Sequence, residues 1–256
     1  MTVLSVNLNK IAWLRNAREG HRPNVLNAAR TAIEAGAQGI TVHPRPDQRH
    51  IRPDDVYQLS EMLTREYPHI EFNIEGNPEA GPNANGYPGF DALIETTRPT
   101  QATLVPDSDD QLTSDHGYDL SRFDPVLAER IAQYKAVGAR VSLFMDPIPA
   151  LIEAARDHGA DRIELYTGPF AEAFWQHGEQ HQVTLDSFRQ YLDAARFATQ
   201  VGLGVNAGHD LDLDNLPLFA EITEVAEVSI GHALISDALD RGLFSAVAAY
   251  ARILKD

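Results

Sequence analysis

The sequence predicts a (β/α)8 TIM barrel with extra helices, built as one domain over residues 1–256. Short apolar runs alternate with amphipathic segments, which is the pattern of a parallel sheet wrapped by helices. A glycine also closes several helices shortly before the next strand, at Gly36, Gly138, Gly159 and Gly202. Eight such units in about 250 residues are typical of a closed barrel.

The first half of the chain supplies four of the expected strands. In order they are Leu4–Asn9, Gly39–His43, Ile70–Glu75 and Ala102–Pro106, with helical patterns at Val25–Glu34 and Asp54–Arg65 between them. Each strand is a short apolar run, whereas each helix spaces its apolar residues by three and four positions. An open doubly wound sheet is the alternative. That fold would usually place a glycine-rich turn after the first strand, where this chain has no glycine.

The second half supplies the other four strands. Before it, two long loops interrupt the alternation of strands and helices. The strands are Val141–Asp146, Arg162–Thr167, Gly202–Ala207 and Glu227–Gly231, with helical patterns at Pro125–Lys135 and Leu185–Gln200. The loop Gly76–Gly89 follows strand three and is rich in turn formers, and the acidic loop Asp107–Leu120 follows strand four. Both lie at the carboxyl ends of strands, where long loops often close over a substrate.

Composition narrows the classes of function. The chain has 21 basic and 37 acidic residues, for a net charge of −16, so its field repels nucleic acids and anionic membranes. With no cysteine, disulfides, thiolate nucleophiles and cysteine metal sites are excluded. No apolar stretch approaches the roughly 20 residues of a membrane helix, and no signal peptide is recognisable. We therefore expect a cytoplasmic protein.

Charged and polar residues collect at the predicted carboxyl ends of the strands. Strand alternation places Glu71, Asn73 and Glu75 on one face, which we expect to point into the barrel. Glu164 lies on strand six, and histidines end three other strands. A single buried glutamate is often only a hydrogen-bonded structural residue. Several glutamates and histidines together favour acid–base catalysis, because burial beside another carboxylate raises a glutamate pKa toward neutrality.

Two features indicate a site for anions. Glycine turns end strands seven and eight, at Asn206–His209 and Ser229–His232, where barrels often bind phosphate, although such glycines can also serve tight turns alone. Arginines follow strands one and two, at positions 15, 18, 45 and 49, with His50 beside them. The alternative is that these arginines are solvated and pair with loop aspartates. We expect no metal, because no His-Glu-x-x-His motif or tight histidine pair is present.

Four blocks of sequence then resemble one family, and together they run from about residue 4 to the C-terminal helices. They are the block Asn7-x-Asn-Lys-Ile-Ala-x-Leu-Arg-Asn-Ala-Arg18, the block Gly39-Ile-Thr-Val-His-Pro-Arg-Pro-Asp-Gln-Arg-His-Ile51, Val205-Asn-Ala-Gly-His209 and Ile230-Gly-His-Ala233. The blocks resemble the pyridoxine 5′-phosphate synthase family. The resemblance implies a cytoplasmic homo-octamer of (β/α)8 barrels, with no cofactor. It implies condensation of 1-deoxy-D-xylulose 5-phosphate with 3-amino-2-oxopropyl phosphate, releasing inorganic phosphate and water.

The resemblance also implies roles for individual residues. His43 and Glu71 match proton acceptors, His209 a proton donor and Glu164 a transition-state stabiliser. The residues that match substrate contacts are Asn7, Asn9, Lys10, Arg18, Arg45, His50, Thr113, Asp210, Gly231 and His232. These roles suit the chemistry, because amine addition, dehydration and ring closure are a series of proton transfers between two bound substrates.

The chain departs from the family pattern at a few positions. Asn9-Lys10 stands where the best-known members carry Asp-His, Asp210 replaces a glycine, and Tyr166 stands where a histidine is common. One alternative is therefore a phosphosugar aldolase or isomerase that uses Lys10 as a Schiff-base nucleophile. A second alternative is a barrel that binds phosphorylated ligands without catalysis.

Overall fold

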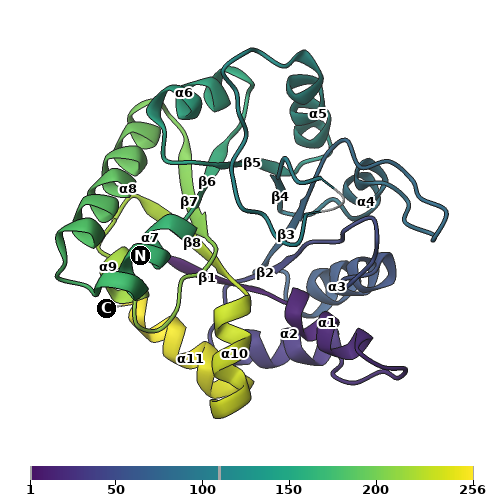
Figure 1. The fold of residues 1–256 in the computed structure, drawn as a ribbon. Helices are drawn as coiled ribbons and strands as arrows, with labels where there is room; N and C mark the ends of the chain where they lie inside the picture. The colour runs from purple at the N-terminus through teal and green to yellow at the C-terminus, as the bar shows by residue number, and fades with distance from the viewer. Residues whose placement is uncertain (1, 109–110, 256) are drawn as a thin grey trace.

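Eight parallel strands close into a barrel in the computed structural model, which describes residues 2–108 and 111–255 (Figure 1). The strands are β1 Val3–Asn7, β2 Gly39–Val42, β3 Glu71–Gly76, β4 Gln101–Leu104, β5 Arg140–Met145, β6 Arg162–Tyr166, β7 Gly204–Gly208 and β8 Val225–Ile230. Each strand pairs with the next in the chain, and β8 pairs with β1. The predicted (β/α)8 barrel is confirmed.

Helices surround the barrel, which Figure 1 shows looking along its axis. They are α1 Asn9–Asn16, α2 Val25–Glu34, α3 Pro53–Glu66, α4 Phe90–Thr97, α5 Pro125–Ala136, α6 Pro149–Asp157, α7 Gly168–His177, α8 Gln182–Gln200, α9 Leu216–Phe219, α10 His232–Arg241 and α11 Leu243–Ile253. Strands β1, β6 and β8 are each followed by two helices, which confirms the extra helices. None of the helices in the described part of the chain is long and apolar enough to span a bilayer.

Local sequence explains where many helices begin and end. Asn24 and Asp124 accept backbone N–H groups of the first turns of α2 and α5, so their side chains cap these helices. The four glycines predicted to close helices all have positive φ, between 90° and 112°. The predicted α2 bounds are reproduced, whereas α8 begins three residues before the predicted start, where His181 accepts the N–H of Val183.

The barrel interior is polar rather than filled only by branched apolar residues. Ser5 and Thr41 hydroxyls lie 2.7 Å apart, and the Thr103 hydroxyl donates to Asn73 Oδ1 at 3.0 Å. The Asn73 amide in turn donates to the Thr41 hydroxyl at 3.3 Å. Apolar residues face outward from the same strands and pack beneath the helices. Because its interior residues bond to one another, the barrel supports polar side chains along its whole length.

Candidate active site

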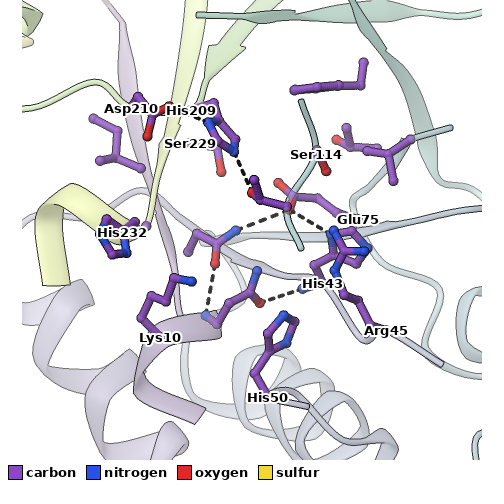
Figure 2. A pocket seen from close by; sticks show the side chains of 18 of the residues that line it. Lys10, His43, Arg45, His50, Glu75, Ser114, His209, Asp210, Ser229 and His232 are labelled. Atoms are coloured by element: carbon purple, nitrogen blue, oxygen red, sulfur yellow. Dashed lines mark hydrogen bonds and ion pairs between the residues drawn. The ribbon is translucent and has the colours of Figure 1, made fainter. Parts of the chain in front are cut away.

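A cavity of about 510 Å3 opens at the carboxyl ends of the strands (Figure 2). It is lined by all but two of the residues predicted for the site. These lining residues are Asn7, Asn9, Lys10, His43, Arg45, His50, Thr113, Glu164, His209, Asp210, Gly231 and His232. The fold therefore brings together groups that lie more than two hundred residues apart in the chain.

A carboxylate and an imidazole face each other on one wall of the cavity. Glu75 Oε2 lies 3.9 Å from His43 Nδ1, and Figure 2 shows the two side chains facing each other. Glu75 Oε2 also accepts a 3.2 Å hydrogen bond from Asn7 Nδ2. The Asn7 side chain also accepts the Asn9 N–H, and Asn9 Oδ1 accepts the His43 N–H at 2.9 Å. The ends of β1, β2 and β3 are thus locked together around Glu75.

Burial sets the protonation of these groups. It raises the pKa of Glu75 to about 7, with the negative charge of Asp107 adding to the effect and His209 opposing it. Burial also raises the pKa of Glu164 well above its ordinary range, and the like charges of Glu75 and Glu227 add to this effect. Burial together with Arg45 and His50 holds the pKa of His43 well below its ordinary value. These shifts favour the uncharged forms, so His43 is suited to accept a proton and Glu164 to donate a hydrogen bond.

The structure corrects the position expected for Glu71. Glu71 begins β3 at the amino-terminal end of the barrel, opposite the cavity, and does not line it. Arg140, which begins β5, donates to its two carboxylate oxygens at 3.3 and 2.5 Å. Although partial burial raises the pKa of Glu71, these hydrogen bonds outweigh burial and lower it. Glu71 is an ion-pair partner in this fold, and Glu75, two inward positions further along the strand, occupies the cavity.

Positive charge gathers beside the ends of β1 and β2. Burial, with Arg45 and Arg49 nearby, lowers the pKa of Lys10, whose Nζ lies 4.9 Å from the centre of the Trp13 ring. His50 Nδ1 accepts the Ile51 N–H at 2.9 Å, and burial lowers the pKa of His50 to about 3. The neutral His50 ring therefore carries its proton on Nε2, which is free to donate to an anion.

Arg45 is held by groups from the loop after β4. It forms an ion pair with Asp107, which is 4 % exposed, and donates to the Gln111 carbonyl at 3.3 Å. The Ser114 hydroxyl donates to the same Asp107 oxygen at 2.7 Å, while Asp107 Oδ1 has no partner among the described residues. Asp107 thus fixes the Arg45 guanidinium at the cavity wall and compensates part of its charge.

The opposite wall is formed by the ends of β7 and β8. His209 Nε2 lies 2.8 Å from the Thr113 hydroxyl, and His209 Nδ1 lies 2.9 Å from Asp210 Oδ2. Gly231 and His232 form the amino-terminal end of α10, whose backbone N–H groups carry partial positive charge. Such a helix end suits a phosphate or another anion.

Arg18 is the second predicted residue that the fold does not bring into the cavity. It is exposed in the turn between α1 and α2 and is absent from the cavity lining. Several lining residues were not predicted as site residues, and among them are Trp13, Glu75, Phe144 and Ser229. Only Glu75 left a usable signal, because strand alternation already placed it on the inward face.

In the described part of the chain, no three histidines or carboxylates are grouped to hold a metal ion.

Comparisons with known proteins identify the family of the chain. Residues 4–256 match the sequence model of a family described as pyridoxal phosphate biosynthesis protein PdxJ. A pyridoxine 5′-phosphate synthase of Xanthomonas oryzae pv. oryzae is 58% identical, covering 100% of this chain and 98% of its own length. One of Xylella fastidiosa is 55% identical, with coverage of 99% and 95%.

Solved structures agree in fold alone. A tryptophan synthase chain from M. tuberculosis superposes with a TM-score of 0.65 at 12% identity, covering 100% of this chain and 94% of that chain. The family match and the relatives cover nearly the whole sequence, and they include the strands that carry the cavity. The chain belongs to the PdxJ family, the family of the pyridoxine 5′-phosphate synthases.

Proposed function

We propose that this protein is an enzyme of vitamin B6 biosynthesis that condenses 1-deoxy-D-xylulose 5-phosphate with 3-amino-2-oxopropyl phosphate. The products are pyridoxine 5′-phosphate, inorganic phosphate and water. One observation carries the proposal beyond family membership: a single cavity holds groups suited to accept and donate protons between two ends that suit anions. Two phosphorylated substrates that must exchange several protons need this combination.

The acid–base groups have different roles because burial and neighbouring charges shift their pKa values differently. Glu75 and His43 are the proton acceptors, because Glu75 ionises near pH 7 and His43 is neutral. The raised pKa of Glu164 favours its protonated form, which donates a hydrogen bond to oxygen atoms that become negative during dehydration and ring closure. His209, across the cavity from Glu75, returns protons to leaving groups.

The two anionic ends of the substrates are held at different strand ends. Gly231 and His232 hold one phosphate at the start of α10, with Asn7 beside them. Lys10, Arg45 and His50 hold the other, and among these three Arg45 already forms an ion pair with Asp107. The cation cluster offsets the long-range repulsion of a chain with a net charge of −16.

A second candidate reaction rests on Lys10. Burial and the nearby Arg45 and Arg49 lower the pKa of Lys10, and a lowered pKa makes it easier for a lysine to lose the proton before it attacks a carbonyl. A phosphosugar aldolase or isomerase would then pass through a Lys10 Schiff base. Borohydride reduction in the presence of either substrate would leave a covalent adduct on Lys10 in that case and none in the synthase reaction.

The test of the proposal is incubation of the purified protein with both phosphorylated substrates. Inorganic phosphate and the absorbance of the pyridine ring are followed in the same sample. The proposal predicts that both rise together in equal amounts, and that neither rises when one substrate is omitted. Phosphate release without the pyridine chromophore, or no reaction with bound substrates, would contradict it.

A further inference from the structure

The turn after β7 has an unusual backbone. His209 and Asp210 have φ values of 89° and 57°, in the left-handed region that residues with side chains rarely adopt. Each such residue costs on the order of 1 to 3 kcal/mol, so two in succession persist only where the surrounding structure enforces them. This pair lies at the carboxyl end of a barrel strand, where catalytic groups of barrels are found.

Neighbouring elements hold this turn from two sides. Thr167, just before α7, donates its N–H to the Gly208 carbonyl at 3.1 Å, and its hydroxyl also contacts the Gly208 and His209 carbonyls. The Asn215 amide, which is fully buried, donates to the Asp210 carbonyl at 3.1 Å. The backbone of the turn is therefore fixed before any substrate binds.

The His209 ring is held by three groups. Asp210 Oδ2 lies 2.9 Å from Nδ1, the Thr113 hydroxyl lies 2.8 Å from Nε2, and the Tyr166 ring packs edge-on with centroids 5.3 Å apart. Tyr166 fits this place because residue 168 is glycine, since a Cβ there would lie 2.3 Å from the Tyr166 hydroxyl oxygen. The ring has little freedom to rotate.

The Asp210 contact determines which nitrogen carries the proton. The hydrogen bond with His209 lowers the pKa of Asp210, so its side chain is a carboxylate that only accepts hydrogen bonds. The Nδ1 atom of His209 must then carry a proton, and Nε2 faces the cavity. A carboxylate behind an imidazole fixes the tautomer and stabilises the imidazolium that forms when Nε2 takes up a proton.

We propose that Asp210 is a positioning residue for the ring-forming reaction, acting through His209 by keeping the Nδ1 proton in place and presenting Nε2 to the substrate. The inference rests on the proposed synthase function, in which His209 donates protons. The other titratable groups that face this pair are Glu75, Tyr166 and His232. Among the residues that the structure describes, none of these three groups bonds to Nδ1, so the tautomer depends on Asp210.

Three variants distinguish the effect of the Asp210 carboxylate from the effect of the strained backbone at this position. Asp210→Asn keeps the size of the side chain, whereas Asp210→Gly removes the side chain and relieves the strain of a positive φ. Asp214→Asn makes the same charge change at an exposed position of the same loop and is the matched control. The readouts are kcat, KM, the pH profile of kcat, the midpoint of thermal unfolding, and the 15N NMR signals of the His209 ring.

Both Asp210 variants are expected to lower kcat by about ten- to a hundredfold, with KM changed by less than about threefold. The pH profile of kcat should change in both Asp210 variants, because the carboxylate beside the His209 ring is then absent. The NMR signals should show the proton on Nδ1 in the unchanged protein and a mixture of tautomers in Asp210→Gly. Asp214→Asn should match the unchanged protein throughout.

Two kinds of result would overturn the proposal. One is a kcat and pH profile in Asp210→Gly equal to those of the unchanged protein, with the Nδ1 tautomer retained. The other is a loss of activity that simply follows a lower unfolding temperature in both variants, because a purely structural role gives that result. If the unchanged protein makes no pyridoxine 5′-phosphate, the proposed function fails. The NMR measurement still decides whether Asp210 sets the His209 tautomer.

Discussion

Replacing Glu75 by glutamine tests which carboxylate accepts protons. Because the pKa of Glu75 is about 7, its side chain is ionised in roughly half of the molecules at pH 7 and in about 1% at pH 5. In the unchanged enzyme kcat/KM should therefore fall about tenfold per pH unit below pH 6. Glu75→Gln should lower the maximum of kcat/KM by about a hundredfold or more and remove its fall at acidic pH.

Glu71→Gln is the matched control, because it makes the same change on the same face of the same strand. Its carboxylate binds Arg140 at the far end of the barrel, and the exposed fractions of the two side chains are 32% and 25%. Loss of such a partly exposed pair costs at most about 1 kcal/mol of stability, and kcat should stay within about twofold. Steady-state kinetics from pH 5 to 9, with the pyridine chromophore as readout, compares both variants. Equal loss of kcat in Glu71→Gln, or an unchanged fall at acidic pH in Glu75→Gln, would refute the assignment.

Three further predictions address stability and binding. Gly117→Ala should lower the free energy of unfolding by about 1 to 3 kcal/mol, because a Cβ would lie 2.4 Å from the Met145 Cα. Urea denaturation measures this change, and an unchanged midpoint of unfolding would contradict the prediction. Burial and Glu71 raise the pKa of Glu227 from 4.5 to about 7, so the folded state binds more protons and stability should fall as pH rises between those values. Glu227→Gln should flatten this fall, and an equal fall in the variant would exclude Glu227 as its source. Lys10→Met should raise KM for one of the two phosphorylated substrates about ten- to a hundredfold with kcat little changed, whereas a lost kcat would favour the Schiff-base reaction.

The sequence predicted the barrel well because each strand and helix carries its own local signal. Apolar runs gave all eight strands to within a few residues, and the polar ends of those runs gave most of the cavity lining. Carboxyl ends of parallel strands meet at one end of a barrel, so residues distant in sequence could be placed together without any structure.

The position of a residue along its strand was harder to predict than the face of the strand on which it lies. Glu71 and Glu75 share the inward face, but four residues at about 3.3 Å each separate them by roughly 13 Å along the barrel. Alternation cannot tell these heights apart. The predicted bounds Ile70–Glu75 already put Glu71 near the start of the strand and Glu75 at its end. The register, which pairs Gly39 with Glu71 and Val42 with Ile74, places Glu75 level with His43.

The sequence left open that the arginines pair with loop aspartates, but it could not predict which loop residues contact one another. Arg45 was predicted as a phosphate contact, but its pairing with Asp107 joins loops after different strands. The bond between Asp210 and His209 depends on a backbone that neither residue favours by itself, so no local propensity indicates it. Such contacts arise from tertiary packing, which overrides local preference.

The most direct test of the account is a crystal structure with pyridoxine 5′-phosphate bound. The account predicts the pyridine ring between Glu75 and His209, with its phosphate at one of the two anion-binding ends of the cavity. A product bound elsewhere, above all near Glu71 and Arg140 at the opposite end of the barrel, would contradict it.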